Sequence, residues 1–213
     1  MRAAPLKQTR RSEEGYTLIA LLALAAIMMI FITAAAPMLR QQAQRERELE
    51  AIRRGEEVAE AIRQYIRINN GVAPTSWEQL QEGVSRGTKK VQILRTSAAR
   101  DPLSKSGEWR LIRPTDQAMI DFQRDLASYT RSTGQVPTND PLLISKRELF
   151  PPPVISTNNA SSDQPCNAAG DEDETENGTG QFIGVASRSR RCSVVNYYGI
   201  NHHDGWIFTP LFR

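Results

Sequence analysis

The chain has 213 residues, of which 39% are hydrophobic and 24% charged, and its net charge is +3. This length fits one domain of ordinary size with appendages, or two small domains. The composition excludes collagen, a coiled-coil rod and a transporter with many spans, and the small net charge gives no support to nucleic acid as a partner. Apolar residues gather early and acidic residues cluster at 171–176, so the segments of the chain differ in character.

The first informative segment is residues 16–39, which contain no charged side chain and follow Lys7, Arg10 and Arg11. As a helix, these twenty-four residues would measure about 36 Å, enough to cross a hydrocarbon core of about 30 Å. The basic residues ahead of the run favour a cytoplasmic N-terminus. The pattern therefore predicts a single-pass anchor, with everything after Leu39 on the other side of the membrane.

Two other interpretations of this apolar run remain open. One is a core helix of a soluble protein, although an uninterrupted run of this length is more typical of a membrane span. The other is a secretory signal peptide, cleaved after the small residues 34–36. The apolar part of a signal peptide is normally about 7 to 15 residues long, so the length of this run argues against cleavage there.

Residues 10–19 read RRSEEGYTLI. This resembles the cleavage motif of type IV pilins and type II secretion pseudopilins, in which a short basic leader and a glycine precede an aromatic residue and an apolar helix. The resemblance implies that a prepilin peptidase removes the leader 1–15 by cutting after Gly15 and methylates the new amino terminus at Tyr16. A glycine suits a cleavage site because it lets extended backbone enter a protease without a Cβ clash.

The resemblance makes the helix that begins with Tyr16, Thr17, Leu18 and Ile19 the assembly element. Pro37 is the twenty-second residue counted from Tyr16, a position at which the family very often has proline. Ala20 departs from the pattern, because most members carry a glutamate at this fifth position, whose carboxylate is thought to neutralise the amino terminus of a neighbouring subunit. Tip-type pseudopilins also lack it, so Ala20 is expected in a tip or minor subunit, or in a branch that assembles differently.

Residues 40–69 keep a helical period, so we predict one helix over 16–69, with a possible bend at Pro37. Its apolar stripe consists of Leu49, Ile52, Ala59, Ile62 and Ile66, with Gly55 in the gap. The remaining positions are rich in Glu and Arg, including Glu46, Glu48 and Glu50, and are expected to form a solvated face. The stripe should pack on a sheet formed further along the chain.

The part of the chain that follows the long helix is expected to fold into a globular head of the α+β class, whose first part is 70–155. Short helices are predicted at 77–83 and 116–130, and strands at 91–94, 109–112, 182–185, 192–198 and 206–212. Residues 156–180 are predicted to form a flexible acidic loop. The tail, 181–213, resembles the C-terminal region of some pseudopilin-like secretion proteins, which implies a small antiparallel sheet packed on the long helix, as in pilins.

The two cysteines, Cys166 and Cys192, both follow the predicted span. An oxidising compartment would pair them in a disulfide, whereas a reducing one would leave two free thiols. Their spacing from His202 and His203 is not that of a zinc site.

Nothing in the sequence predicts an enzyme, because no phosphate loop, dinucleotide fingerprint or convincing nucleophile and base is present. No cofactor is therefore expected, with calcium as the one weak candidate. Major pseudopilins bind calcium in a head loop, which makes Asp171, Asp173 and Asp204 possible ligands by resemblance. A solvated acidic run is the simpler interpretation of 171–176.

The expected function is thus that of a pseudopilus subunit of a type II secretion system in the bacterial inner membrane, with its C-terminal domain in the periplasm. The expected partners are other pilin-like subunits, the prepilin peptidase and the inner-membrane assembly platform. One alternative is a minor pilin of a type IV or DNA-uptake pilus, in which the basic turn at Arg188, Arg190 and Arg191 could touch phosphate, although a surface turn with no binding role is the simpler interpretation. Another is a signal-anchored periplasmic domain that never polymerises.

Overall fold

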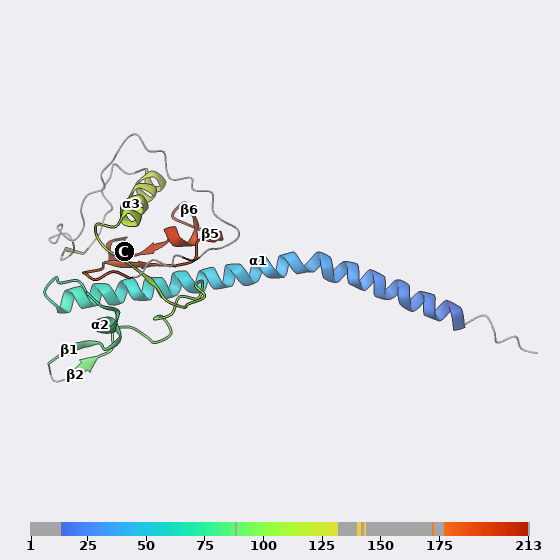
Figure 1. Cartoon of the computed structure of the whole chain (residues 1–213), viewed down its shortest axis with the longest axis horizontal. Coiled ribbons are helices and arrows are strands. Elements are labelled where there is room, and N and C mark those ends of the chain that lie inside the picture. The colour runs from blue at the N-terminus through green and yellow to red at the C-terminus, as the bar shows by residue number, and fades with distance from the viewer. Residues whose placement is uncertain are drawn as a thin grey trace, which may run out of the picture. The chain divides into compact units, whose positions relative to one another are not determined.

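The computed structural model describes residues 14–87, 89–131, 140–141, 143, 172 and 177–212. The chain divides into two compact units, Met1–Ala43 and Gln44–Arg213, which we describe separately. The predicted leader 1–15 and acidic loop 156–180 lie largely outside the described residues. The expected α+β layout, with a long N-terminal helix and small antiparallel sheets in the C-terminal part, is confirmed (Figure 1).

In chain order the elements are α1 (Glu14–Ile68), α2 (Trp77–Gln81), β1 (Val84–Arg86), β2 (Lys89–Val91), β3 (Arg110–Ile112), α3 (Gln117–Thr130), β4 (Gly184–Ala186), β5 (Cys192–Tyr197), β6 (Ile200–His202), β7 (Ile207–Phe208) and two short 3-10 helices, η2 (His203–Gly205) and η3 (Pro210–Phe212).

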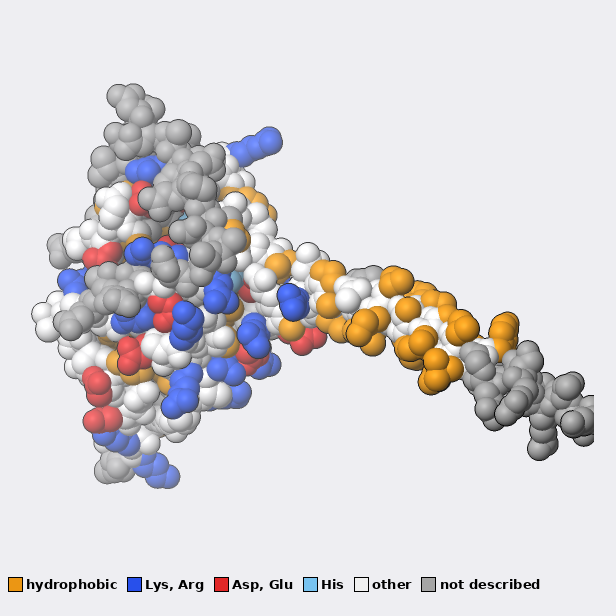
Figure 2. Space-filling model, turned by 45° about the vertical axis from the view of Figure 1, so that its right-hand side comes forward, with side chains coloured by type: hydrophobic (Ala, Val, Ile, Leu, Met, Phe, Trp, Pro, Cys, Tyr) orange, Lys and Arg blue, Asp and Glu red, His pale blue; other side chains and the backbone are white. Residues whose placement is uncertain are grey.

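The first unit contains the apolar part of α1. Every side chain from 16 to 33 is exposed, and the visible face of this segment is covered by hydrophobic side chains (Figure 2). The helix is long and apolar enough to cross a membrane. Its one hydroxyl in the 18–33 stretch is satisfied locally, because Thr33 Oγ1 donates to the carbonyls of Met29 and Ile30 at 3.0 and 2.9 Å. The segment therefore suits a surrounding without water.

In the second unit, the rest of α1 contributes one face to the core. The buried positions are Ala51, Gly55, Val58, Ile62 and Ile66, with Ala59 and Ala61 beside them. The predicted stripe is correct from Gly55 onward and wrong at its start, since Leu49 is half exposed. Glu48, which we predicted on the solvated face, is fully buried instead. It lies three residues before Ala51, in line with the buried face.

Gly55 allows the closest approach between the helix and the C-terminal tail. A Cβ atom at this position would lie 2.2 Å from the Phe208 ring, far inside van der Waals contact. Phe208, on β7, is itself buried and packs edge-on against Trp109 with ring centroids 5.9 Å apart. The absence of a side chain at Gly55 therefore leaves the space that the Phe208 ring occupies.

The strands form three separate antiparallel groups: a hairpin β1-β2, a sheet of order β3-β4-β7 and a hairpin β5-β6. The expectation of one sheet for the tail is thus wrong, since β5 pairs apart from β4 and β7. The strand expected at 206–212 ends at Phe208 because Pro210, which has no N–H to give to a ladder, starts η3. The strand expected at 91–94 is replaced by β2, which ends at Val91.

The other predicted elements are found with shifted bounds. The helices α2 and α3 and the strands β3, β4 and β5 match the predictions at 77–83, 116–130, 109–112, 182–185 and 192–198 within about two residues. The strand β6 was not predicted, because its Ile-Asn-His sequence lacks a β-branched and aromatic alternation and was interpreted as a turn.

An asparagine side chain closes the outer edge of β3. The Leu111 amide donates to Asn177 Oδ1 at 2.9 Å, and Asn177 Nδ2 donates to the Trp109 carbonyl at 3.2 Å. The amide group thus provides one acceptor and one donor, as the backbone of a neighbouring strand would.

The contact between Gly55 and Phe208 gives a stability prediction. We expect Gly55→Ala to lower the free energy of unfolding by about 1 to 3 kcal/mol, because the added methyl group overpacks a filled site. An alanine in an open helix position would instead stabilise the chain by about 1 kcal/mol. The measurement is denaturant unfolding of the full chain in detergent micelles, followed by the fluorescence of its three tryptophans.

Phe208→Leu supplies the control, since a smaller side chain there should relieve the clash. The double variant should then be more stable than the sum of the two single changes predicts. A stabilised Gly55→Ala protein would show that the ring can move away at no cost, contrary to the packing described.

Candidate functional site

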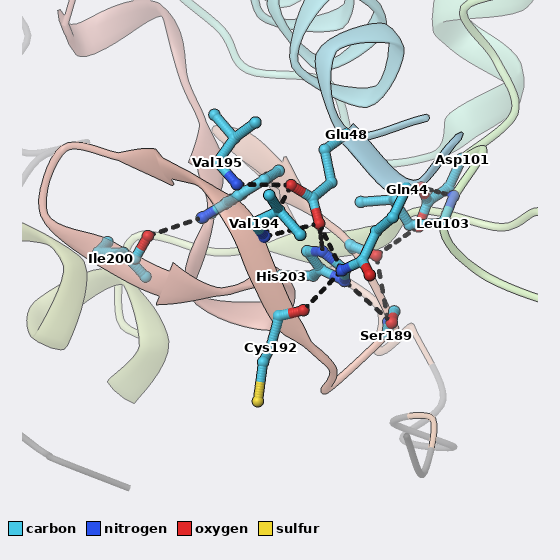
Figure 3. A network of polar contacts seen from close by, with 12 residues as sticks. Gln44, Glu48, Asp101, Leu103, Ser189, Cys192, Val194, Val195, Ile200 and His203 are labelled. Atoms are coloured by element: carbon cyan, nitrogen blue, oxygen red, sulfur yellow. Dashed lines mark hydrogen bonds and ion pairs between the residues drawn. The ribbon is translucent and has the colours of Figure 1, made fainter. Parts of the chain in front are cut away.

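The most elaborate polar arrangement of the described residues surrounds Glu48 of α1 (Figure 3). Its carboxylate is 0% exposed and accepts hydrogen bonds from the Val194 amide at 3.0 Å and the Val195 amide at 2.7 Å. Gln44 Nε2, one helical turn earlier, donates to Glu48 Oε1 at 2.8 Å and to the Cys192 carbonyl at 3.0 Å. One turn of helix therefore holds the first half of β5.

The reason for this arrangement is an irregularity in the β5-β6 hairpin. Cys192 pairs with His202 and Tyr197 pairs with Ile200, so the register shifts between the two ends of β5. A bulge leaves backbone groups without ladder partners. The two consecutive amides of Val194 and Val195 donate to one carboxylate instead. The Glu48 oxygens therefore take the place of the acceptors that a regular ladder would provide.

His203 connects Glu48 to a second buried carboxylate. His203 Nε2 lies 3.0 Å from Glu48 Oε1, and its Nδ1 lies 3.2 Å from Ser189 Oγ. In a neutral imidazole whose Nε2 donates to the Glu48 carboxylate, Nδ1 accepts from the Ser189 hydroxyl.

The chain of contacts continues from Ser189 to Asp101. The Ser189 amide donates to Ser187 Oγ at 3.1 Å, and Ser187 Oγ donates to Asp101 Oδ2 at 2.7 Å. Asp101 also accepts from the Leu103 amide at 2.9 Å. We call the residues Glu48, His203, Ser189, Ser187 and Asp101 the polar clasp. It joins α1, the loop before β3, the turn after β4 and η2.

The two carboxyl groups at the ends of the polar clasp are perturbed in opposite directions. Burial by itself would raise the pKa of Glu48. The hydrogen bonds donated by the Val194 amide and by His203, with those of Val195 and Gln44, outweigh burial and hold this pKa below its ordinary value. At Asp101 burial dominates and raises the pKa, although the Leu103 amide and the Ser187 hydroxyl stabilise the charged form.

Serine, histidine and glutamate are hydrogen-bonded in the order that nucleophilic hydrolases use. The burial argues against that chemistry here, because a nucleophile must meet its substrate. Ser189 is 3% exposed, and His203 and Glu48 are equally enclosed. The arrangement can hold four chain segments together and respond to protonation. In the folded state Ser189 is closed to solvent.

The residues that the sequence singled out for processing and assembly lie on α1. Gly15 and Tyr16 belong to its first turn, and Leu18, Ile19 and Ala20 are exposed on the following one, as is Pro37 further along. Thr17 lies among them and is also exposed. These residues are separate from the polar clasp, which starts at Glu48.

The cysteine and calcium predictions fall partly outside the described residues. Cys192 is disulfide-bonded, whereas Cys166 lies outside the described residues, so their pairing stays a prediction. Asp171 and Asp173 also lie outside. Asp204 Oδ1 is 3.9 Å from His202 Nε2, and no group of three or more potential metal ligands occurs within the described part of the chain.

The basic turn at 188–191 is exposed only in part. Arg188 is buried, and its Nη2 lies 3.9 Å from Glu108 Oε2. Arg190 and Arg191 remain exposed. Of the three arginines, Arg188 is thus not at the surface, and a phosphate contact at Arg190 and Arg191 stays a prediction.

Sequence reasoning missed Glu48, His203 and Ser189. A signal for Glu48 was available, because positions 48, 51, 55, 58 and 62 are spaced by three or four and a glutamate there falls on the apolar face. No sequence signal identifies Ser189 or His203, since their roles depend on the turn after β4 meeting η2.

No protein-family model matches the chain, and comparisons with curated proteins and with solved structures found no significant match.

The polar clasp predicts a large stability effect for a single substitution. Glu48→Ala leaves the Val194 and Val195 amides and His203 without their acceptor, and we expect a loss of about 3 to 5 kcal/mol in the free energy of unfolding. Denaturant unfolding in micelles measures it. Glu46→Ala, an exposed glutamate two residues earlier, is the matched control and should stay within about 0.5 kcal/mol. Equal effects would mean that Glu48 contributes no more than surface charge.

The lowered pKa of Glu48 also predicts a pH dependence. The unfolded chain binds a proton at this group at higher pH than the native chain does, so the stabilisation is present above the unfolded pKa and is lost as pH falls through the native pKa. The raised pKa of Asp101 acts with the opposite sign, because its contribution is lost as pH rises through its native pKa.

A comparison of the native chain with Glu48→Gln isolates the first effect, since both proteins keep Asp101. The difference in their unfolding free energies should be largest near neutral pH and should shrink as pH falls below about 4. The measurement is a series of denaturant titrations over pH. A difference that grows towards acid would contradict the predicted sign.

Proposed function

We propose that this protein is a prepilin-like, membrane-anchored subunit that is processed after Gly15 and assembles through its N-terminal helix, as in the pseudopilus of a type II secretion system. The observation that carries the proposal is that α1 is a single helix with two different surroundings. Its apolar residues from 16 to 33 are exposed, and its residues from 51 to 66 form one side of the core of an α+β unit.

The exposed apolar segment supports the anchoring and packing part of the proposal. Eighteen consecutive exposed residues without a charge are unstable in water, and they require lipid or the same segment of other subunits around them. In the proposed cycle, membrane lipid surrounds the segment first and neighbouring subunits later. The work of such a protein is mechanical, and its partners are further pilin-like subunits, the peptidase and an inner-membrane assembly platform.

The start of α1 supports the processing part. Gly15 and Tyr16 are in the first helical turn, so a peptidase must unwind that turn to reach the bond between them. Glycine makes this step easier, because it is a poor helix former by about 1 kcal/mol relative to alanine.

A second candidate is a signal-anchored periplasmic domain that never polymerises. Ala20 favours it, because an alanine provides no carboxylate to pair with the amino terminus of a neighbouring subunit. The same observation fits a tip or minor subunit, which needs fewer such contacts.

The deciding experiment is the intact mass and N-terminal sequence of the protein extracted from membranes of its native host. We expect a chain that begins at N-methylated Tyr16, and we expect Gly15→Val to keep residues 1–15. An intact Met1 in the unsubstituted protein would favour the simple anchored domain, and a start after Ala36 would mean a soluble exported protein.

Assembly needs its own measurement, because processing alone does not show a fibre. The mature protein should appear in the sheared surface-fibre or pseudopilus fraction as well as in membranes. If the correctly processed protein were found only in membranes, the proposed anchor would stand and the proposed polymerisation would be contradicted.

A further inference from the structure

Two arginines of α1 differ from those that follow them on the same helix. Arg53 and Arg54 pair with Glu50, and Arg63 and Arg67 pair with Asp140, at distances between 2.6 and 2.9 Å. Arg45 and Arg47 are exposed, and neither has an ion pair or hydrogen bond with the described part of the chain. They are thus available to an anionic partner.

The charge of this segment is not cancelled locally. Within 40–47 the arginines at 40, 45 and 47 face a single acidic residue, the exposed Glu46. Glu48 is not part of this surface, because its carboxylate is turned into the core, where hydrogen bonds stabilise its charge. The segment therefore carries two net positive charges.

Helical geometry brings these charges within reach of a membrane surface. Arg45 and Arg47 follow Leu39, the last residue of the uncharged run, by six and eight residues, or about 9 and 12 Å along a helix. Side chains of a helix tilt towards its N-terminus, which is the direction of the apolar run. Long arginine stems extend this reach, and the polar layer of a bilayer is itself about 5 to 8 Å thick on each side.

The distribution of the two side chains around the helix selects the partner. Residues two apart on an α-helix point about 200° apart, so Arg45 and Arg47 project to opposite sides. A single protein surface meets one side of a helix, whereas lipid headgroups surround it. Guanidinium groups bind phosphate oxygens through paired hydrogen bonds and stay charged at every relevant pH.

We propose that Arg45 and Arg47 bind the phosphate groups of anionic phospholipids at the membrane surface that adjoins the span. The proposal rests on the anchoring part of the proposed function and does not need polymerisation. Its consequence is that a subunit leaving the membrane must release these headgroups, so anionic lipid would hold the subunit in its membrane form.

The test uses the full chain reconstituted in phosphatidylcholine vesicles that contain a trace of spin-labelled phosphatidylglycerol or spin-labelled phosphatidylcholine. Electron paramagnetic resonance gives the relative association of the two labelled lipids with the protein. For the native chain we expect a preference for phosphatidylglycerol of at least about five-fold at low salt, which should weaken at high salt. The R45Q/R47Q variant should lose most of this preference.

The matched control is R53Q/R95Q, which removes the same charge from two exposed arginines whose surface ion pairs contribute little to stability. It should keep the preference. An equal loss in both variants would mean a general charge effect, and an unchanged R45Q/R47Q protein would mean that these arginines do not contact lipid; either overturns the proposal. Unchanged lipid preference with weaker cross-linking between copies would assign the arginines to a second subunit and also overturn it.

Resistance to alkaline carbonate extraction is measured first, because it shows whether the chain is anchored in the vesicles. A chain that is extracted contradicts both the anchor and the lipid contact. A chain that is anchored but shows no lipid preference contradicts the lipid contact alone and leaves the proposed function standing.

Discussion

The position of the C-terminal tail on the long helix depends on one buried carboxylate, that of Glu48. Removing a charge from water costs several kcal/mol unless the protein replaces the lost solvation, and Glu48 is compensated by two adjacent backbone amides, a histidine and a glutamine. Those amides belong to a bulged strand that has no ladder partner for them. Helix and hairpin therefore each satisfy a requirement of the other, and this mutual dependence fixes where β5 lies on α1.

The second constraint is steric and acts two turns further along the helix. At Gly55 the absence of a side chain admits the ring of Phe208, and the ring in turn contacts Trp109. A polar contact thus holds β5 and an aromatic contact holds β7, although the two strands belong to different sheets. Together they explain how a tail of very short strands keeps a defined position on the helix.

The spacing of apolar residues and the positions of turn-forming residues were enough to predict the helices and most strands, because these elements depend on local sequence. The long helix, α2 and α3 follow from apolar spacing and turn residues. The division of the tail into two sheets could not be predicted, since strand partners are chosen by contacts between distant residues. The prediction placed Glu48 on the wrong face because a glutamate on a helix is usually exposed to solvent. The contact between Ser189 and His203 has no local signature in the sequence.

The side chain of Asn177 has a consequence for how copies of this chain can meet. An open strand edge invites another chain to add a strand, which is a common route to unwanted aggregation. At β3 the backbone groups of Leu111 and Trp109 are already occupied by the asparagine amide, so an incoming strand would first have to displace it. Sheet growth is discouraged at this edge, and under the proposed assembly through the helix a competing route of association is thereby closed.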